Sequence, residues 1–288
     1  MSYVNTPKIK DIVKRALAED IGKGDITVKL LFPKGGKVQA VISADDTGVI
    51  CGVDIACLVF KLLDNNIRFI PRVKDGARVS KGQIVAKIYG RASSILTGER
   101  VALNFLGLLS AIATRTNKFV SKIKGYKVKV MDTRKTIPGL RELEKYAVRV
   151  GGGYNHRFGL DEMVLIKENH LMAFSPGCSV WSIKKVIKTV KENKKRNLKL
   201  EIEVKNLREL KQALKANPGI VMLDNMSVKQ VKKAVAARDK LNPKLKIEVS
   251  GNIDLRNICT YARTGVDFIS SGILTKDVHY LDLSLEVK

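Results

Sequence analysis

The sequence predicts an α/β protein in which a mixed α+β domain is followed by a β/α barrel. Over roughly the first 100 residues, helical patterns are mixed with short strand-like runs. From Tyr126 onward, short apolar or β-branched runs alternate with helical patterns, which is typical of parallel strands joined by crossover helices. Six or more such repeats in about 150 residues favour a closed barrel. A doubly wound open sheet is the structural alternative.

The N-terminal domain is expected to contain several short elements and one hairpin. Residue patterns predict a helix at 8–19, strands at 38–44 and 48–53, and a helix at 54–63. The segment 71–90 alternates apolar and polar residues around the turns Asp75-Gly76 and Lys81-Gly82, as hairpins do. It resembles half of a biotinyl or lipoyl carrier domain but lacks the flanked lysine that is modified in such carriers. We therefore expect it to be scaffold.

A long helix is expected over residues 97–122. Its residues Leu103, Leu106, Leu109 and Ile112 share one apolar face, and charged residues lie near its ends. This helix is expected to connect the N-terminal domain to the barrel.

The barrel is expected to consist of strands and helices in strict alternation. The strands are predicted at VKVM (128–131), MVLI (163–166), LKLEIEV (198–204), IVMLD (220–224), LKIEVS (245–250) and VDFIS (266–270). The helices are predicted at 139–148, 181–192, 206–215, 228–239 and 257–263.

Polar or glycine residues lie at the end of every predicted barrel strand, where β/α barrels carry their chemistry. In strand order they are Asp132 with Thr133, Arg134 and Lys135; Lys167 with Asn169 and His170; Glu201 and Glu203; Asp224 and Asn225; Ser250 and Gly251; and Ser271 and Gly272. Each alone is consistent with a surface position. Together they indicate a rim with cations on the first two strands and acids later, suited to an anionic substrate beside a metal or a developing positive charge.

Two glycine-containing features are further candidates for anion binding. Gly151 to Gly153 end a predicted helix and place His156 and Arg157 side by side in the next loop. The common phosphate motifs GxxxxGK[ST] and GxGxxG are absent. The turns Ser250-Gly251-Asn252 and Ser271-Gly272 can nevertheless offer backbone N–H groups to a phosphate, or serve only as loop-to-helix junctions.

The net charge is the one unusual bulk property. The 288 residues include 53 Lys or Arg and 28 Asp or Glu, giving a formal charge of +25. This excess is compatible with nucleic-acid binding, with a pocket for polyanionic small molecules, or with a solvated Lys-rich surface. Only 6% of residues are aromatic and no nucleic-acid-binding motif is present, so nucleic acid is the least favoured partner.

Composition also bears on the compartment. A hydrophobic fraction of 45% is typical of globular chains, and no apolar run reaches the roughly 18 residues of a membrane span. No secretory signal pattern is present, so we expect a cytoplasmic protein that binds no membrane. The cysteines Cys51, Cys57, Cys178 and Cys259 are too scattered for a zinc knuckle and are expected to be reduced.

The run MDTRKTIPGLRELEKYAVRVGGGYNHRFGLDEMVLIKENH, residues 131–170, resembles the quinolinate phosphoribosyltransferase family. The resemblance continues in EDIGKGDIT at 19–27, GERVALNFLGLLSAIAT at 98–114, EIEV at 201–204 and LDN at 223–225, and in VSGNI and SSGIL nearer the C-terminus. It implies transfer of a phosphoribosyl group from phosphoribosyl pyrophosphate to quinolinate with decarboxylation, giving nicotinate mononucleotide, pyrophosphate and CO2 for NAD biosynthesis. It also implies an N-terminal α/β sandwich and a seven-stranded barrel.

The resemblance also implies roles for individual residues. Lys135, Glu203 and Asp224 would be catalytic, and the two acids would face the ribose and Mg2+ through pyrophosphate. The implied substrate-binding residues are Arg100, Thr133, Arg134, His156, Arg157, Lys167, Ser250, Gly251, Asn252, Ser271 and Gly272. Arg100 would come from the partner subunit of a homodimer with shared active sites, which could assemble into a higher oligomer.

We expect three segments: a domain at 1–115 that includes the connecting helix, the catalytic barrel at 116–276, and a segment at 277–288 that returns to the first domain. Two positions depart from the family pattern, Glu168 in place of Asp and Lys205 in place of an acid. The alternative functions are a molybdenum-transport-associated paralogue of the same fold and a basic nucleic-acid-binding protein. The retained cations of the DTRKT, NHR and LIKENH motifs favour the enzyme.

Overall fold

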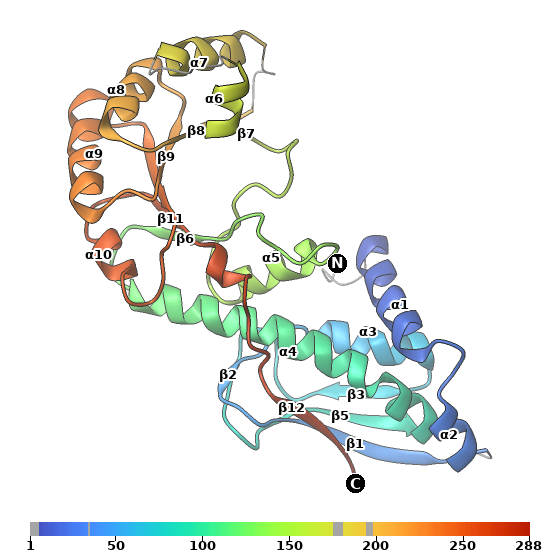
Figure 1. The fold of residues 1–288 in the computed structure, drawn as a ribbon. Helices are drawn as coiled ribbons and strands as arrows, with labels where there is room; N and C mark the ends of the chain where they lie inside the picture. The colour runs from blue at the N-terminus through green and yellow to red at the C-terminus, as the bar shows by residue number, and fades with distance from the viewer. Residues whose placement is uncertain (1–5, 34, 175–180, 194–197) are drawn as a thin grey trace. The chain divides into compact units, whose positions relative to one another are not determined.

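The computed structural model describes residues 6–33, 35–174, 181–193 and 198–288, with Cys178 outside these ranges. The chain divides into two compact units (Figure 1). Unit 1 comprises residues 1–117, 136–152 and 274–288, and unit 2 comprises residues 118–135 and 153–273. The expected α/β class is confirmed, since each unit contains a sheet and helices.

Unit 1 is built on an antiparallel sheet whose strands come from both ends of the described chain. The strand order is β12 (Leu283–Val287), β1 (Lys37–Ala44), β5 (Ile84–Arg91) and β3 (Arg68–Pro71). A separate short pair is formed by β2 (Gly48–Val49) and β4 (Arg78–Val79). The helices of unit 1 are α1 (Pro7–Ile21), α2 (Ile26–Leu31), α3 (Val53–Leu63), most of α4 (Ala92–Lys122) and α5 (Arg141–Val150).

The N-terminal helices begin at local capping groups. The Thr6 side chain accepts a hydrogen bond from the Ile9 N–H at the start of α1, and Asp25 accepts from the Val28 N–H at the start of α2. The expected strand at 48–53 is wrong beyond Val49. The Cys51 N–H donates to Oγ of Ser110 at 2.9 Å rather than to a strand, and the chain then enters α3.

Asp75 connects three parts of unit 1. One carboxylate oxygen accepts the N–H groups of Gly52 and Val53, each at 3.0 Å, and so caps the start of α3. The other accepts the Tyr146 hydroxyl of α5 at 2.8 Å. Burial, followed by the charge of Asp75, raises the pKa of Tyr146. The turn that the sequence indicated is therefore also a packing point for two helices.

Helix α4 is longer than expected and supplies much of the core of unit 1. Leu106, Leu109 and Ile112 are fully buried on its apolar face. Among the described residues, α4 alone is long and apolar enough to cross a membrane by composition, but 72% of the relevant window is buried inside the protein. That burial is typical of a core helix.

Unit 2 contains the parallel sheet that the alternating pattern predicted. Its strands, in spatial order, are β6 (Lys129–Met131), β11 (Phe268–Ser270), β10 (Lys246–Ser250), β9 (Ile220–Asp224), β8 (Leu200–Val204) and β7 (Val164–Ile166). All five strand pairs are parallel. Tyr154 makes an isolated parallel bridge with Met131, which adds one extended position beside β6 on the side away from β11. The sheet is thus barrel-like, with six strands and this bridge.

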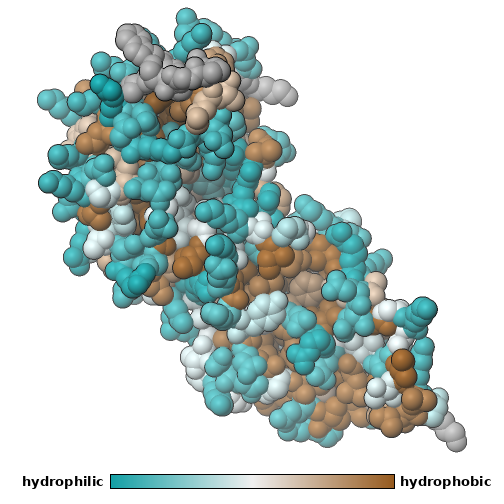
Figure 2. All heavy atoms as spheres, in the orientation of Figure 1, coloured by the Kyte–Doolittle hydropathy of each residue, from teal (hydrophilic) through white to brown (hydrophobic). Residues whose placement is uncertain are grey.

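The helices of unit 2 follow its strands. They are α6 (Glu168–Phe174), α7 (Trp181–Asn193), α8 (Leu207–Ala216), α9 (Val228–Leu241) and α10 (Ile258–Ala262). The outer side chains of α9 include the exposed Lys229, Lys232 and Lys233. Figure 2 shows mainly hydrophilic side chains over α8 and α9 on the face in view. Part of the excess positive charge therefore lies on a solvated helix surface. This agrees with the explanation of the net charge by a solvated Lys-rich surface.

Buried ion pairing fixes one end of α9 to the sheet. Nη1 of Arg238 donates to Oδ2 of Asp267 at 2.8 Å, and Nη2 donates to the carbonyl of Gly265 at 3.2 Å. Asp267 also accepts the Ile247 N–H at 2.9 Å at the start of β10. These bonds lie at the amino ends of the strands and leave the carboxyl ends available for function.

Candidate active site

The carboxyl ends of the strands in unit 2 carry nearly all the candidate residues. Because the strands are parallel, these ends lie at one edge of the sheet. The residues in unit 2 are Thr133, Arg134, Lys135, His156, Arg157, Lys167, Glu203, Asp224, Ser250, Gly251, Asn252, Ser271 and Gly272. Arg100 belongs to unit 1, where it occupies an exposed position on α4.

The loop after β6 lies against the turn after β11. A β-carbon on Gly272 would come within 2.8 Å of Cδ of Lys135 and 3.5 Å of Oγ1 of Thr133. Glycine at this position therefore allows Lys135 to pass close to the turn. The Lys135 N–H donates to Oγ1 of Thr133 at 3.1 Å, which shapes the loop. Arg134 and Lys135 are both exposed, so the loop presents two cations.

His156 is buried beneath this edge and makes defined contacts through its backbone and ring. Its N–H donates to Oδ1 of Asp132 at 2.8 Å, and its ring Nδ1 accepts the Arg157 N–H at 2.8 Å. An accepting Nδ1 assigns the ring proton to Nε2. Nε2 lies 3.1 Å from Oε2 of Glu201 and 3.5 Å from Oε2 of Glu248.

Glu201 and Glu248 are two carboxyl groups in the interior of unit 2. Their exposed fractions are 0% and 1%. Burial raises the pKa of each to about 8, and the neighbouring charge of Glu201 adds to the effect on Glu248. The Ser270 hydroxyl donates to Oε1 of Glu248 at 2.6 Å. Together with His156, the two acids bring potential metal-ligating atoms within 4.8 Å of one another.

Arg157 is buried but keeps part of its guanidinium available. Nη1 donates to the carbonyl of Met163 at 2.9 Å. Among the described residues, Nε and Nη2 donate no hydrogen bond to the protein. Burial, followed by the neighbouring charge of Arg134, lowers the pKa of Arg157, although an arginine stays protonated at neutral pH. The two free donors form a fork that suits a carboxylate.

Lys167, Glu203 and Asp224 bring one cation and two acids together at successive strand ends. Nζ of Lys167 lies 3.6 Å from Oε2 of Glu203. Burial raises the pKa of Glu203; Lys167 opposes this shift, whereas Asp224 adds to it. Glu203 pairs with Met222 of β9, and Asp224 lies two residues further along β9 on the same face, so the two carboxyl groups belong to neighbouring strand ends. Such oxygen donors suit Mg2+.

The turn after β10 requires glycine at position 251. Its φ is +98°, and a β-carbon would lie 2.2 Å from Oδ1 of Asn225. Nδ2 of Asn252 donates to the same Oδ1 at 3.3 Å, which links the turns after β9 and β10. In the neighbouring turn, the Ser271 hydroxyl donates to the carbonyl of Ile253 at 2.7 Å. Thus the two predicted phosphate turns are tied together by side-chain contacts.

Sequence reasoning missed Glu248 and Ser270 as parts of this site. It named Asp132 only as a polar residue at a strand end, and it treated Glu201 only as one of two acids on its strand. The strand register offers a signal that could have found Glu248. Met222 of β9 pairs with Glu203 on one side and Glu248 on the other, so these residues face the same side of the sheet. A glutamate at such a position in an otherwise apolar run is buried only with partners.

The two departures from the family pattern contact each other. Nζ of Lys205 and a carboxylate oxygen of Glu168 form an ion pair between the loop after β8 and the start of α6. This pairing raises the pKa of Lys205. The lysine that replaces an acid therefore has a local acidic partner, and both side chains are about half exposed.

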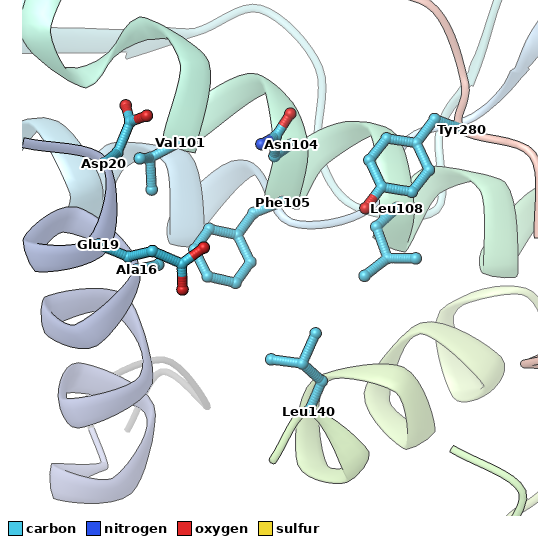
Figure 3. A pocket seen from close by; sticks show the side chains of 9 residues that line it. All are labelled: Ala16, Glu19, Asp20, Val101, Asn104, Phe105, Leu108, Leu140 and Tyr280. Atoms are coloured by element: carbon cyan, nitrogen blue, oxygen red, sulfur yellow. The ribbon is translucent and has the colours of Figure 1, made fainter. Parts of the chain in front are cut away.

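A cavity in unit 1 is lined by acidic residues, in contrast to the cations at the carboxyl edge of the sheet in unit 2. It has a volume of about 150 Å³ and is lined by Ala16, Glu19, Asp20, Val101, Asn104, Phe105, Leu108, Leu140 and Tyr280. Figure 3 shows Glu19 and Asp20 on α1 and the apolar side chains of α4 around it. Because its charged residues are acids, this cavity does not suit a polyanion.

Family models match almost the whole chain. The model described as quinolinate phosphoribosyl transferase, N-terminal domain, matches residues 25–110, and that of the C-terminal domain matches residues 112–286. The chain belongs to the quinolinate phosphoribosyl transferase family. The resemblance seen in the sequence is thereby confirmed, and the family's enzymes are pentosyl-transferring enzymes rather than nucleic-acid-binding proteins.

Individual family members agree closely with this chain. A protein of Synechocystis named probable nicotinate-nucleotide pyrophosphorylase [carboxylating] is 43% identical over 271 residues, covering 94% of this chain and 90% of that protein. A Methanocaldococcus jannaschii protein of the same name is 42% identical, with 96% of each covered. The structure of the nicotinate-nucleotide pyrophosphorylase from Francisella tularensis has a TM-score of 0.88 and 42% identity, covering 100% of this chain and 99% of that one. These names do not favour the molybdenum-transport alternative.

Proposed function

We propose that this protein transfers the phosphoribosyl group of phosphoribosyl pyrophosphate to quinolinate, with loss of CO2. The products are nicotinate mononucleotide and pyrophosphate, an entry into NAD biosynthesis. The observation that carries this proposal is the grouping of cations and acids at the carboxyl edge of the sheet, in a chain of the quinolinate phosphoribosyl transferase family. The proposed setting is the cytoplasm.

The binding step is assigned to the cations. Quinolinate has two carboxylates, and the free Nε and Nη2 of Arg157 can hold one of them bidentately. The flexible side chains of Arg134, Lys135 and Lys167 add positive charge toward the second carboxylate and the phosphates. The backbone N–H groups of the turns at Gly251 and Gly272 are assigned to the phosphate.

The transfer step is assigned to the acids. As the bond from ribose C1 to pyrophosphate lengthens, positive charge develops on the ribose, and the carboxylates of Glu203 and Asp224 stabilise it. We also propose that these acids hold Mg2+ through pyrophosphate. Bound there, Mg2+ would neutralise the leaving group. The quinolinate ring nitrogen then forms the bond to C1.

Loss of CO2 follows from the charge on the new pyridinium ring. The electron pair of the breaking C2–carboxyl bond is delocalised toward the positive ring nitrogen, so no separate electron-accepting cofactor is needed. A proton then replaces the carboxyl group at C2, supplied by Lys135 or by water. The close approach of the Lys135 side chain to the turn of Gly272 supports this role.

The test is an assay of the purified protein with phosphoribosyl pyrophosphate, Mg2+ and either quinolinate or nicotinate. Formation of nicotinate mononucleotide and CO2 from quinolinate alone, abolished by a chelator, is the expected result. If the folded protein gives no product with either pyridine, the transferase proposal is wrong. Product from nicotinate without CO2 would indicate a different acceptor.

We further propose a homodimer in which Arg100 completes the site of the partner subunit. The support is its family resemblance and its exposed position on α4. Arg100→Ala and Lys135→Ala proteins would each be inactive, while a mixture that forms heterodimers would regain part of the activity through one intact site. Heterodimers that remain inactive would contradict the shared site.

A further inference from the structure

The imidazole of His156 directs both ring nitrogens toward the protein. Nδ1 accepts the Arg157 N–H, and Nε2 faces the carboxyl groups of Glu201 and Glu248 at 3.1 and 3.5 Å. The residue is only 7% exposed. A direct hydrogen bond from this ring to quinolinate would require one of these contacts to be given up. The geometry therefore favours a different role for His156 from the substrate contact that the resemblance implied.

The position of His156 affects its neighbour Arg157, which lies at the edge of the site. Its backbone N–H is fixed by His156, and its guanidinium is fixed at one nitrogen by the Met163 carbonyl. The two remaining donor nitrogens make no hydrogen bond with the described residues, although the charge of Glu201 acts on the guanidinium. A rotation of the imidazole would move the backbone of Arg157 and, with it, this fork.

The carboxyl groups behind the ring are themselves held in place. Glu248 accepts the Ser270 hydroxyl at 2.6 Å, and Glu201 lies on β8, two strands away from β10 in the sheet. Both side chains are buried on rigid strands rather than on loops. Buried carboxyl groups this close to Nε2 favour a ring whose N–H is directed at them, although the 3.1 Å contact with Glu201 lacks the angles of a hydrogen bond.

We propose that Glu201 and Glu248 are positioning residues that hold His156 in its Nε2–H form and thereby orient Arg157 toward an anionic pyridine. They do not touch the substrate; Glu248 acts through His156, and Glu201 acts both through His156 and through its charge on Arg157. The inference rests on the proposed function for the identity of the anion. The arrangement of the protein groups is independent of it.

A first test observes the ring and its neighbour directly. The chain has three histidines, so 15N-histidine labelling gives few NMR signals. We expect His156 to carry its proton on Nε2, with the Arg157 amide proton shifted downfield by its bond to Nδ1. The exposed His170, whose Nδ1 accepts the Lys167 N–H at 2.9 Å, is the internal comparison. A proton on Nδ1, or a metal ion bound at Nε2, would overturn the proposal.

A second test separates orientation from packing. Glu201→Leu removes the acceptor, whereas Glu201→Gln keeps one. We expect the Leu variant to lose the downfield Arg157 amide signal and to raise the KM for quinolinate by about 10-fold to 100-fold, with kcat and the KM for phosphoribosyl pyrophosphate changed far less. The Gln variant should keep the amide signal and stay within about threefold of the original KM.

The matched control is Met222→Leu, a volume-conserving change at a buried position in register with Glu248. It should alter neither the amide signal nor the KM. The positioning role is refuted if Met222→Leu has the same effect as Glu201→Leu, or if Glu201→Leu behaves like the parent protein. If Glu201→Leu does not fold, Glu248→Leu and Glu248→Gln provide the same comparison.

The two proposals can fail separately. If the parent protein makes no mononucleotide but the NMR signals and their loss in the Leu variant are as expected, the transferase proposal fails and the positioning network stands. If the parent is active while Nε2 carries no proton, the positioning proposal fails alone.

Discussion

Oδ1 of Asn225 occupies the space into which a β-carbon on Gly251 would project, 2.2 Å from that atom's ideal position. Asn225 follows β9 and Gly251 follows β10, so the contact joins two neighbouring strand ends that the sequence separates by a whole helix. The positive φ of Gly251 adds a second constraint on the same residue. Shape at this edge is therefore set by the absence of a side chain as much as by the charged groups.

Gly251→Ala is expected to reduce both stability and substrate binding. The strained backbone and the displaced Asn225 should cost about 1–3 kcal/mol of unfolding free energy, and the KM for phosphoribosyl pyrophosphate should rise. Urea unfolding and steady-state kinetics measure these effects. Gly82→Ala is the control, because Gly82 has a φ of +81° but open space around it. Equal kinetic effects in both variants would contradict a specific role for the Asn225 contact.

Lys167 and Lys205 follow adjacent strands and should differ greatly in importance. Lys167→Ala removes the cation beside Glu203 and should lower kcat/KM by about 10²-fold to 10³-fold. Lys205→Ala breaks an exposed ion pair with Glu168 and removes a weak, solvent-screened charge effect on Glu203, so it should change kcat/KM by less than about threefold. Steady-state assays of both variants, with circular dichroism to verify folding, make the comparison. A loss at Lys205 as large as at Lys167 would show that the assignment is wrong.

The buried Glu248 should make the protein less stable as pH rises. Burial raises its pKa from the usual 4.5 to about 8, so the folded state binds its proton more tightly than the unfolded state. Stability is therefore greatest below pH 4.5 for this group and falls as pH increases toward 8, by about 1 kcal/mol per pH unit at the steepest. Urea midpoints across this range measure the slope. Because the pKa of Glu201 is also raised to about 8, Glu248→Gln should reduce the slope without removing it, and an unchanged slope would exclude Glu248 as a source.

Asp75→Ala should destabilise unit 1 without altering the chemistry at the strand ends. It removes the cap on α3 and the acceptor for the Tyr146 hydroxyl, at an expected cost of about 2–4 kcal/mol. Tyr146→Phe removes only the hydroxyl bond to Asp75, so it should lower the free energy of unfolding by less. Asp54→Ala is the control, because Asp54 is exposed on α3, the helix that Asp75 caps. Thermal unfolding of the three variants would contradict the inference if Asp54→Ala were the most damaging.

Most of the barrel-like fold could be predicted because its strands are short apolar runs with regular helical patterns between them. All six expected strands are present, from Val130 in β6 to Ile269 in β11. The N-terminal region was harder. Helix α2 has only six residues and depends on the Asp25 cap, while residues after Val49 bond to a side chain of α4 instead of a strand. Neither interaction leaves a periodic pattern in the sequence.

The candidate site could be predicted only in part for a related reason. Cations such as Lys135 and Lys167 follow strands directly, so the strand-end rule finds them. The surroundings of His156 depend on Glu201 and Glu248, which are far from it in the chain and meet it only through the curvature of the sheet. Residue type and spacing therefore suggested the substrate-facing groups, whereas the orientation of His156 required the structure.

The pairing of β12 with β1 places a constraint on the order in which the protein matures. β1 precedes the parallel sheet in the chain and β12 follows it, with Ile42 opposite Leu285 in an antiparallel register. During translation, that edge of β1 stays open until every strand of unit 2 has left the ribosome. A nascent chain stalled before residue 283 would expose unpaired backbone N–H and C=O groups, a template for association with other stalled chains.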